Sequence, residues 1–175
     1  AHFPDRTPLE FTATNWAQAQ VVEVRGTQDD TFDGTQPFDQ KIGPSESADA
    51  RYDQKFEGLK SFECLDDDVV GLNVTVLKPT SSEAGRRAEV VAALTSAPKA
   101  PILFSISSLD VSEGVPEPSI FVLSQQNWKA GEVIQSVGQS DDIDDGPMKY
   151  TIAVTPITTE DPDYLSVSAK YVELT

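Results

Sequence analysis

Carboxylate side chains gather in three short clusters in this 175-residue sequence. They occupy residues 29–34, 66–68 and 141–146, and the first and third share the pattern Asp-Asp-x-x-Asp-Gly. Neighbouring carboxylates repel one another by about 1 kcal/mol at 4 Å in water, and by more where water is excluded. A bound cation removes this repulsion. Calcium, which takes about six to eight oxygen ligands in irregular geometry, suits such clusters well.

The same clusters also have a purely structural interpretation. Asp and Gly are common in exposed turns, because Asp bonds the nearby backbone and Gly adopts positive φ. For one cluster alone the two interpretations are equally good. The recurrence of the pattern at the same place in two copies favours metal binding. The spacing does not match the single calcium loop of an EF-hand, so we expect a site assembled from several loops.

Charge and composition exclude several other classes of function. The 13 Lys and Arg residues stand against 29 Asp and Glu, and the net charge of −16 opposes binding to nucleic acid. His2 is the single histidine and Cys64 the single cysteine, so a zinc site is not expected. The sequence has no Ser-His-Asp order and no phosphate-binding loop, and we expect no enzyme activity. No apolar run is long enough to span a membrane.

An internal repeat organises the chain. Adding 112 to the residue number takes Asn15-Trp16 to Asn127-Trp128 and Asp33-Gly34 to Asp145-Gly146. Between positions 15 and 52 this offset gives 11 identities without a gap, where about two are expected by chance. The other identical pairs are Val21/Val133, Gly26/Gly138, Asp29/Asp141, Asp30/Asp142, Pro44/Pro156, Asp49/Asp161 and Tyr52/Tyr164.

A repeat of this length is the size of a whole domain, whereas solenoid repeats are much shorter. Residues 1–66 are therefore predicted to form the C-terminal half of one repeat. Residues 67–175 are predicted to form a second repeat that lacks its final acidic run. On this interpretation the sequence is expected to be part of a longer tandem array.

The pattern of apolar residues predicts an all-β chain. Alternating stretches recur at short intervals and are separated by turn clusters. Residues 82–94 also have helical propensity, but their alternation and position favour a strand. The predicted strands are residues 9–13, 20–25, 38–42, 59–64, 69–77, 88–94, 102–107, 119–123, 132–137, 148–154 and 166–174.

About seven strands in each repeat suggest an antiparallel immunoglobulin-like β-sandwich. Trp16 and Trp128 are predicted to begin a strand and fill the core rather than bind a ligand. Tyr52 and Tyr164 are predicted to pack beside the paired strands.

The order of these motifs resembles a Calx-beta-like domain, in particular the tandem Calx-beta-related repeats of cell-surface and adhesin-type proteins. The likeness covers nearly the whole chain, as half a repeat plus one. It rests on Glu83-Ala-Gly, Asp110-x-Ser-Glu113-Gly, Phe121, Asn127-Trp128, Val133-Ile134, Asp141-Asp142-x-Asp144-Asp145-Gly146, Tyr150-Thr-Ile and the triple Asp66-Asp67-Asp68.

The resemblance implies a seven-stranded sandwich that binds Ca²⁺ at one end, through acidic side chains of several loops. Arg86 and Arg87 depart from the expected pattern and could pair with these acids. The ligands implied for the first repeat are Asp29, Asp30, Asp33, Asp66, Asp67 and Asp68. Those implied for the second repeat are Glu83, Asp110, Glu113, Asp141, Asp142 and Asp145.

We expect an extracellular or cell-surface module with a structural or adhesive role, stiffened by calcium and belonging to a longer array or filament. Its expected partners are neighbouring repeats or copies of the same protein, and possible further partners are surface glycans or proteins. The alternative is a carbohydrate- or protein-binding accessory module of a larger secreted protein. Exposed aromatic side chains on one face would favour that alternative.

Two further residues bear on the extracellular expectation. Asn73-Val74-Thr75 is an N-glycosylation sequon, usable only if the predicted strand exposes Asn73. Cys64 lies near the Asp triplet and is expected to be buried and inert, or else to form a disulfide with another chain.

Overall fold

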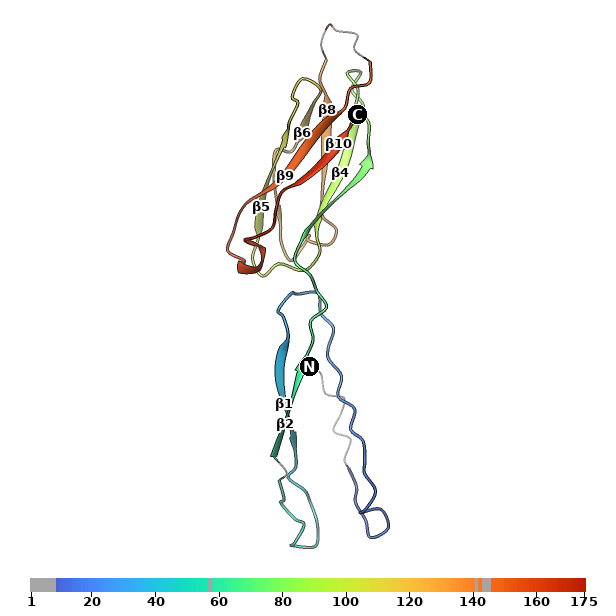
Figure 1. The fold of residues 1–175 in the computed structure, drawn as a ribbon, viewed down its shortest axis with the longest axis vertical. Coiled ribbons are helices and arrows are strands. Elements are labelled where there is room, and N and C mark those ends of the chain that lie inside the picture. Colours follow the sequence, from blue (N-terminus) through green and yellow to red (C-terminus); the bar gives the residue numbers. More distant parts are fainter. Residues whose placement is uncertain (1–8, 57, 141, 143–145) are drawn as a thin grey trace. The chain divides into compact units, whose positions relative to one another are not determined.

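The computed structural model describes residues 9–56, 58–140, 142 and 146–175 (Figure 1). The described part is all-β apart from one short 3-10 helix, and its paired strands run antiparallel, which confirms the predicted fold class at this level. The chain divides into two compact units. The first holds residues up to Asp29 together with Asp33–Asp66, and the second holds Asp30–Phe32 together with Asp67–Thr175.

The first unit contains one hairpin in its described part. Strand β1 (Gln36–Ile42) pairs with β2 (Gly58–Cys64). Phe38 lies opposite Phe62, with the ring centroids 5.6 Å apart. The described residues before and between these strands form turns and irregular structure.

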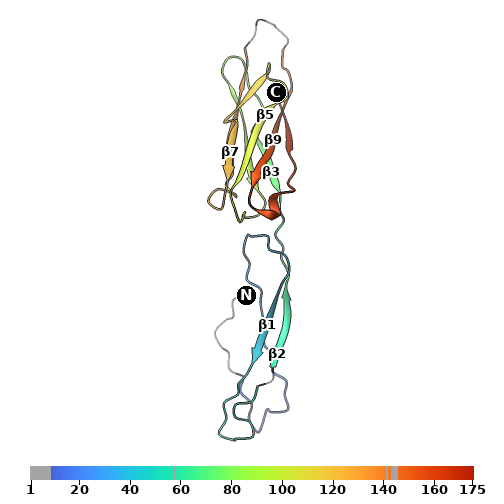
Figure 2. The same ribbon diagram turned by 90° about the vertical axis from the view of Figure 1, so that its left-hand side faces the viewer.

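The second unit contains two four-stranded sheets, with the orders β10-β9-β5-β7 and β3-β4-β8-β6. Figure 2 shows β7, β5 and β9 of the first of these sheets side by side. A 3-10 helix, η1 (Pro162–Tyr164), lies between β9 and β10. The strands are β3 (Leu72–Lys78), β4 (Arg87–Leu94), β5 (Ile102–Ser108), β6 (Gly114–Glu117), β7 (Ile120–Leu123), β8 (Glu132–Gly138), β9 (Tyr150–Thr159) and β10 (Lys170–Leu174).

Both sheets contribute to one hydrophobic core, as in a β-sandwich. The period-2 alternation of β4 buries every second residue, so β4 is a strand and the helical alternative for residues 82–94 is wrong. From the other sheet, Phe104 stacks on Phe121 with centroids 5.1 Å apart. Each large apolar side chain buried in this way contributes about 1.5–3 kcal/mol.

Most predicted strands overlap an observed strand, and two do not. Residues 9–13 and 20–25 were predicted as strands but have no strand conformation. Strand β6 was not predicted, because it has only four residues and carries Pro116, which removes a backbone donor.

The repeated aromatic residues behave differently in the two units. Trp128 packs partly buried against the core, but in a turn before β8 rather than in the strand, and Tyr164 is fully buried. Trp16 is 73% exposed and Tyr52 is 65% exposed, so the predicted core roles of these two residues are wrong. Their unit offers no described strands in the place of those that cover Trp128 and Tyr164.

A buried polar cluster at one end of the second unit surrounds Tyr164. Its hydroxyl donates a hydrogen bond to the Ser96 carbonyl at 2.6 Å and shares another with Ser96 Oγ at 2.9 Å. Asp161 is also buried and accepts hydrogen bonds from the backbone of Lys99 at 2.6 Å and of Asp163 at 3.0 Å. Burial raises the pKa of Tyr164 above its ordinary value of 10.0, against the opposing effect of the Ser96 hydrogen bonds.

Replacing Tyr164 by Phe is expected to lower the free energy of unfolding by about 1–3 kcal/mol, because it leaves Ser96 without its buried partner. The raised pKa means that the folded state holds the phenol proton more tightly than the unfolded state. The advantage of wild type over Tyr164→Phe is therefore fully present below about pH 10 and lost as pH rises through the folded pKa. Urea unfolding at a series of pH values measures it, and a constant difference up to about pH 11 would contradict the assignment.

Candidate metal centre

In the described part of the chain, the triad Asp66-Asp67-Asp68 brings three acidic side chains close enough together to hold a metal ion. Each of its carboxylates offers one oxygen, and these oxygens lie within 4.8 Å of one another. Asp66 and Asp68 are half-buried and Asp67 is exposed. Three carboxylates supply about half of the oxygen ligands that calcium takes, so this donor set fits a hard cation that completes its shell with backbone carbonyls or water.

Asp66 also holds the acidic turn at residues 29–34. Its Oδ2 accepts hydrogen bonds from the backbone of Asp33 at 2.8 Å and of Gly34 at 2.6 Å. Gly34 has φ of 70°, a conformation that side chains with a Cβ rarely adopt. The glycine of the repeated motif thus shapes a turn whose amides bind the triad, a link that the sequence analysis did not predict.

The other acidic residues predicted for the first repeat do not join the triad in a three-carboxylate group. Asp29 and Asp33 are exposed. Asp30 forms an exposed ion pair with Lys129 at 3.4 Å, and its carbonyl accepts a hydrogen bond from Ala97. The triad and the turn that it holds are therefore the core of the candidate site.

The segments that carry Glu83 and Glu113 meet the segment after β8 at one end of the second unit. Ser140 Oγ, just after β8, donates to Glu83 Oε2 at 3.5 Å, and the Glu113 carbonyl accepts from the Gln139 amide at 3.1 Å. The end of β10 meets the same loops, because Ser81 donates to the Thr175 carbonyl at 2.7 Å. Figure 1 shows the chain end marked C at this end of the unit. We call these segments the acidic loop end.

The carboxylates at the acidic loop end do not form a compact group in the described residues. Asp110 stabilises its own turn, since its Oδ1 accepts from the backbone of Ser112 at 3.2 Å and from Ser112 Oγ at 2.5 Å. Asp142 is exposed. Asp141 and Asp145 lie outside the described residues.

The two arginines that could have neutralised this end do not do so through a described ion pair with its acids. Arg87 Nη1 lies 3.0 Å from Glu117 Oε2 and 3.1 Å from Gln135 Oε1, on the strands of its own sheet. Arg86 contributes backbone hydrogen bonds to Ser82. The Arg87 guanidinium therefore pairs with side chains on strands of its own sheet.

Tight packing joins the loops at this end. A Cβ on Gly114 would lie 2.5 Å from ring atoms of Tyr150, which is buried. The Tyr150 hydroxyl in turn shares a 3.0 Å hydrogen bond with Ser81 Oγ. The glycine in the motif Asp110-x-Ser-Glu113-Gly is therefore required by the position of Tyr150.

Replacing Gly114 by Ala is expected to displace the Tyr150 ring and lower the free energy of unfolding by about 1–3 kcal/mol. Thermal or urea unfolding measures the loss. The matched control is the same change in a Tyr150→Leu background, where the ring is absent and the added cost of Gly114→Ala should shrink. Equal costs in both backgrounds would contradict this packing.

Asn73 is exposed on β3, at the edge of its sheet, so the N-glycosylation sequon meets the requirement that its asparagine be exposed.

Cys64 is free and half-buried, and a Cβ on Gly26 would lie 2.8 Å from its Sγ. Glycosylation of Asn73 and pairing of Cys64 with another chain stay predictions.

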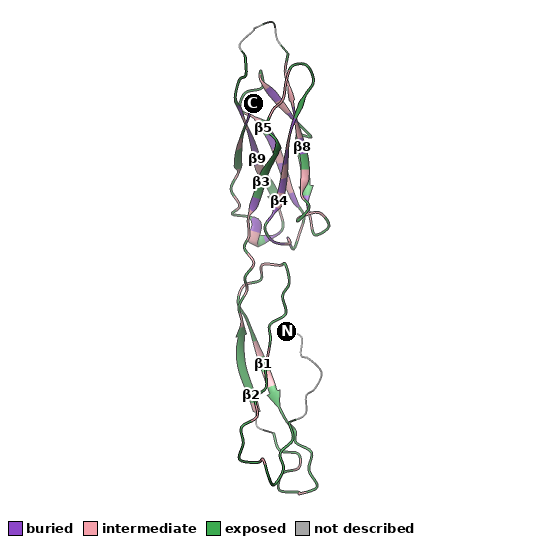
Figure 3. Cartoon of the chain, turned by 90° about the vertical axis from the view of Figure 1, so that its right-hand side faces the viewer, coloured by how far each residue is buried: buried purple, intermediate pink, exposed green. Residues whose placement is uncertain are grey.

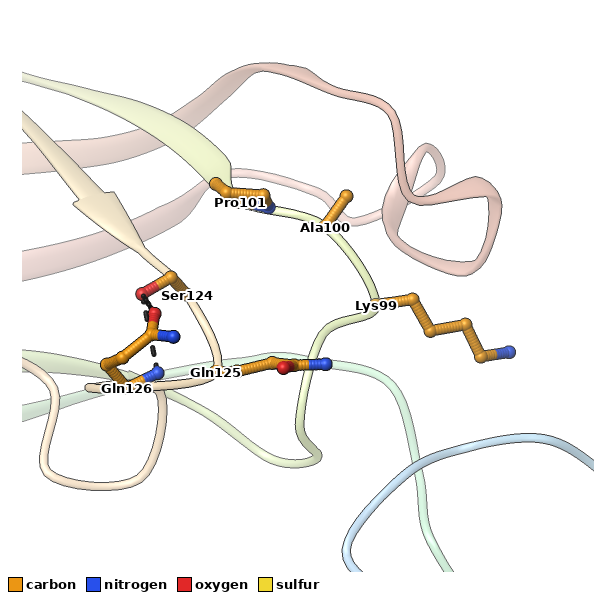
Figure 4. Close-up of a pocket in the computed structure, with 6 residues that line it drawn as sticks. All are labelled: Lys99, Ala100, Pro101, Ser124, Gln125 and Gln126. Atoms are coloured by element: carbon orange, nitrogen blue, oxygen red, sulfur yellow. Dashed lines mark hydrogen bonds between the residues drawn. The ribbon is translucent and has the colours of Figure 1, made fainter.

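A small hollow of about 110 Å³ lies in the second unit, between residues 99–101 and 124–126. Figure 4 shows that the Lys99 side chain points away from Ser124 and Gln126. Lys99 Nζ forms an ion pair with Asp163 at 2.7 Å instead. The hollow is lined by amide, hydroxyl and apolar groups and offers no carboxylate, imidazole or thiol.

Comparisons with known proteins give little overlap. No protein-family model matches the sequence, and no curated protein matches it. A crystal structure of the E. coli chaperone DraB is similar at a TM-score of 0.39 and 16% sequence identity, over 60% of this chain and 52% of that one. The chain thus spans about half the length of that structure. The Calx-beta-like resemblance stays a prediction.

The described residues include no helix with the length and apolar character of a membrane span.

Proposed function

We propose that the chain is a calcium-stiffened repeat module with a structural or adhesive role in an extracellular or cell-surface array or filament. The observation that carries the proposal is the Asp66–Asp68 triad, whose three carboxylates converge and whose first member holds the repeated acidic turn. Its partners would be neighbouring repeats or copies of the same protein.

The fold of each repeat is proposed to be an immunoglobulin-like, Calx-beta-like sandwich. Two antiparallel four-stranded sheets around one core support this for the second unit. The gathering of the Glu83, Glu113 and Ser140 segments at one end of the second unit supports a loop-borne cation site there.

Calcium would replace the repulsion among the three carboxylates of the triad by their attraction to one cation. Without a cation, three adjacent carboxylates repel one another and favour conformations that separate them. With a cation, the same charges attract a common centre, which restricts the backbone of residues 66–68 and reinforces the turn bound to Asp66. Extracellular calcium modules bind at about 10⁻⁴–10⁻³ M, which is why an extracellular setting suits this role.

Addition of about 10 mM Ca²⁺ is expected to stabilise the chain by roughly 1–3 kcal/mol, from the binding linkage at these affinities. For a chain of this size that corresponds to a melting temperature raised by about 3–10 °C. Calorimetry with calcium and with chelator measures the shift. No response to either would overturn the metal role.

The matched variants separate cation binding from turn structure. Asp67→Asn and Asp68→Asn together should abolish the calcium response while leaving the hydrogen bonds of Asp66 intact. Glu46→Gln, an exposed carboxylate outside the clusters, should leave the response unchanged. A response that survives the double variant would place the ion elsewhere, with the acidic loop end as the next candidate.

One observation supports the alternative, a ligand-binding accessory module. Aromatic side chains that are exposed in the first unit include Phe11, Trp16, Tyr52 and Phe56. If these exposed aromatic side chains bind glycans, soluble oligosaccharides should change the tryptophan fluorescence, and Trp16→Phe should remove the change. The leading proposal expects no change in either protein.

A further inference from the structure

The two copies of the repeat share local hydrogen bonds as well as residue identities. In the turn of the first copy, Asn15 Oδ1 accepts from the backbone of Thr12, and the amide of Trp16 donates to the Thr12 carbonyl at 3.0 Å. In the second copy, Asn127 Oδ1 accepts from the backbone of Ser124, and the amide of Trp128 donates to the Ser124 carbonyl at 2.9 Å. The offset of the sequence repeat therefore relates the donors and acceptors of these hydrogen bonds in the two turns.

The loops at Asp49 and Asp161 repeat in the same way. Asp49 Oδ1 accepts from the amide of Arg51 at 3.0 Å, and Asp161 Oδ1 accepts from the amide of Asp163 at 3.0 Å. The amides of Tyr52 and Tyr164 then donate to the carbonyls of Asp49 and Asp161, respectively. These loops take the same form whether the tyrosine ring is exposed or buried.

The hairpins also have one register. In the first unit Phe38 lies opposite Phe62, and Ile42 lies opposite Gly58. The offset converts these pairs into Tyr150 opposite Leu174 and Val154 opposite Lys170, which are the observed pairs of β9 and β10. Hence β1 and β2 are the counterparts of β9 and β10.

Burial separates the copies where hydrogen bonding does not (Figure 3). The counterparts of five exposed side chains in the first unit lie in, or pack against, the core of the second unit. The exposed residues, with exposed fractions, are Trp16 (73%), Val22 (53%), Ile42 (40%), Tyr52 (65%) and Phe62 (44%), and their counterparts are Trp128, Ile134, Val154, Tyr164 and Leu174. Because their counterparts all belong to or pack against one core, we call these five exposed residues together the uncovered face.

The strands that cover the counterparts are known from the second unit. There β5 pairs with the free edge of β9, and β4 and β6 flank β8. The counterpart of β8 is residues 20–26, which have no strand conformation and, among the described residues, pair with no strand. A strand needs a neighbouring strand to pair its backbone groups, so the failure of residues 20–25 to form the predicted strand has the same cause as the uncovered face.

We propose that the uncovered face is a docking surface for a half-sandwich with the strand pattern of residues 67–112, carried on the same polypeptide. The occupant would supply counterparts of β3, β4 and β5, with inward apolar side chains like those of Val90, Phe104 and Ile106. It would bury the five side chains and let residues 20–26 become a strand. This inference goes beyond the proposed function and does not depend on calcium.

A source on the same polypeptide follows from the order of the strands. The offset takes Leu9 and Phe11 to Phe121 and Leu123, the buried residues of β7. Residues 9–11 therefore correspond to β7, whose partner β5 comes earlier in the chain. The docked half-sandwich would reach Leu9 by the connection that links β5 to β7 in the second unit.

The test is a graft in which residues 1–14 are replaced by a second copy of residues 67–126. This joins Gln126 to Asn15, as Gln126 is joined to Asn127 in the second unit. The grafted segment adds no tryptophan, so a Trp128→Phe background makes Trp16 the sole reporter. Fluorescence quenching by acrylamide, measured in chelator, should fall from an exposed value in the ungrafted chain to the value that Trp128 shows in a Trp16→Phe background.

The matched control is the same graft with V90D and F104D in the grafted copy alone, which should leave Trp16 as accessible as in the ungrafted chain. Equal quenching in graft and control overturns the proposal. A separate peptide of residues 67–126 that protects Trp16 as fully as the graft would place the occupant on another chain and overturn the same-polypeptide source.

A second measurement does not require the graft to fold. In the ungrafted chain, Trp16→Ala should leave the melting temperature unchanged, whereas Trp128→Ala should lower it. Loss of stability with Trp16→Ala would mean that Trp16 is already packed and would overturn the proposal. A dimer in sedimentation in which Trp16 is protected would assign the face to a second copy and would also overturn it.

Discussion

The structure depends on one constraint: an apolar sheet face must be covered by another sheet. In the second unit this requirement is met, and β9 and β8 bury Val154 and Ile134 against strands of the opposite sheet. The same hairpin register and turn bonds exist in the first unit, where the equivalent side chains are exposed. Local interactions alone set hairpins and turns, whereas burial requires the second layer.

The position of the acidic residues follows from the strands. Antiparallel strands return their connections to the two ends of a sheet, so loops far apart in sequence meet at one end. This brings the segments of Glu83, Glu113 and Ser140 together. In the first unit a side chain connects the acidic segments instead, because the Asp66 carboxylate accepts hydrogen bonds from the amides of Asp33 and Gly34. Both arrangements concentrate negative charge in loops rather than along the strands.

Several acidic side chains have structural roles that the pattern of apolar residues does not predict. Asp161 is a buried carboxylate that serves structure, since it accepts two backbone hydrogen bonds near Tyr164. Asp110 likewise caps its own turn. Neither of these acids needs a metal to explain its position. The triad differs, because its three carboxylates converge on one another.

Sequence alone determined the all-β class, most of the strands and the internal repeat, because alternation and repeated turn residues are local properties. It predicted strand conformation for β4 correctly and core positions for Trp128 and Tyr164. It could not decide whether Trp16, Tyr52 and residues 20–25 would adopt the state of their counterparts. Tertiary structure decided that, because identical local patterns become strand and core only where a neighbouring sheet removes them from water and pairs their backbone.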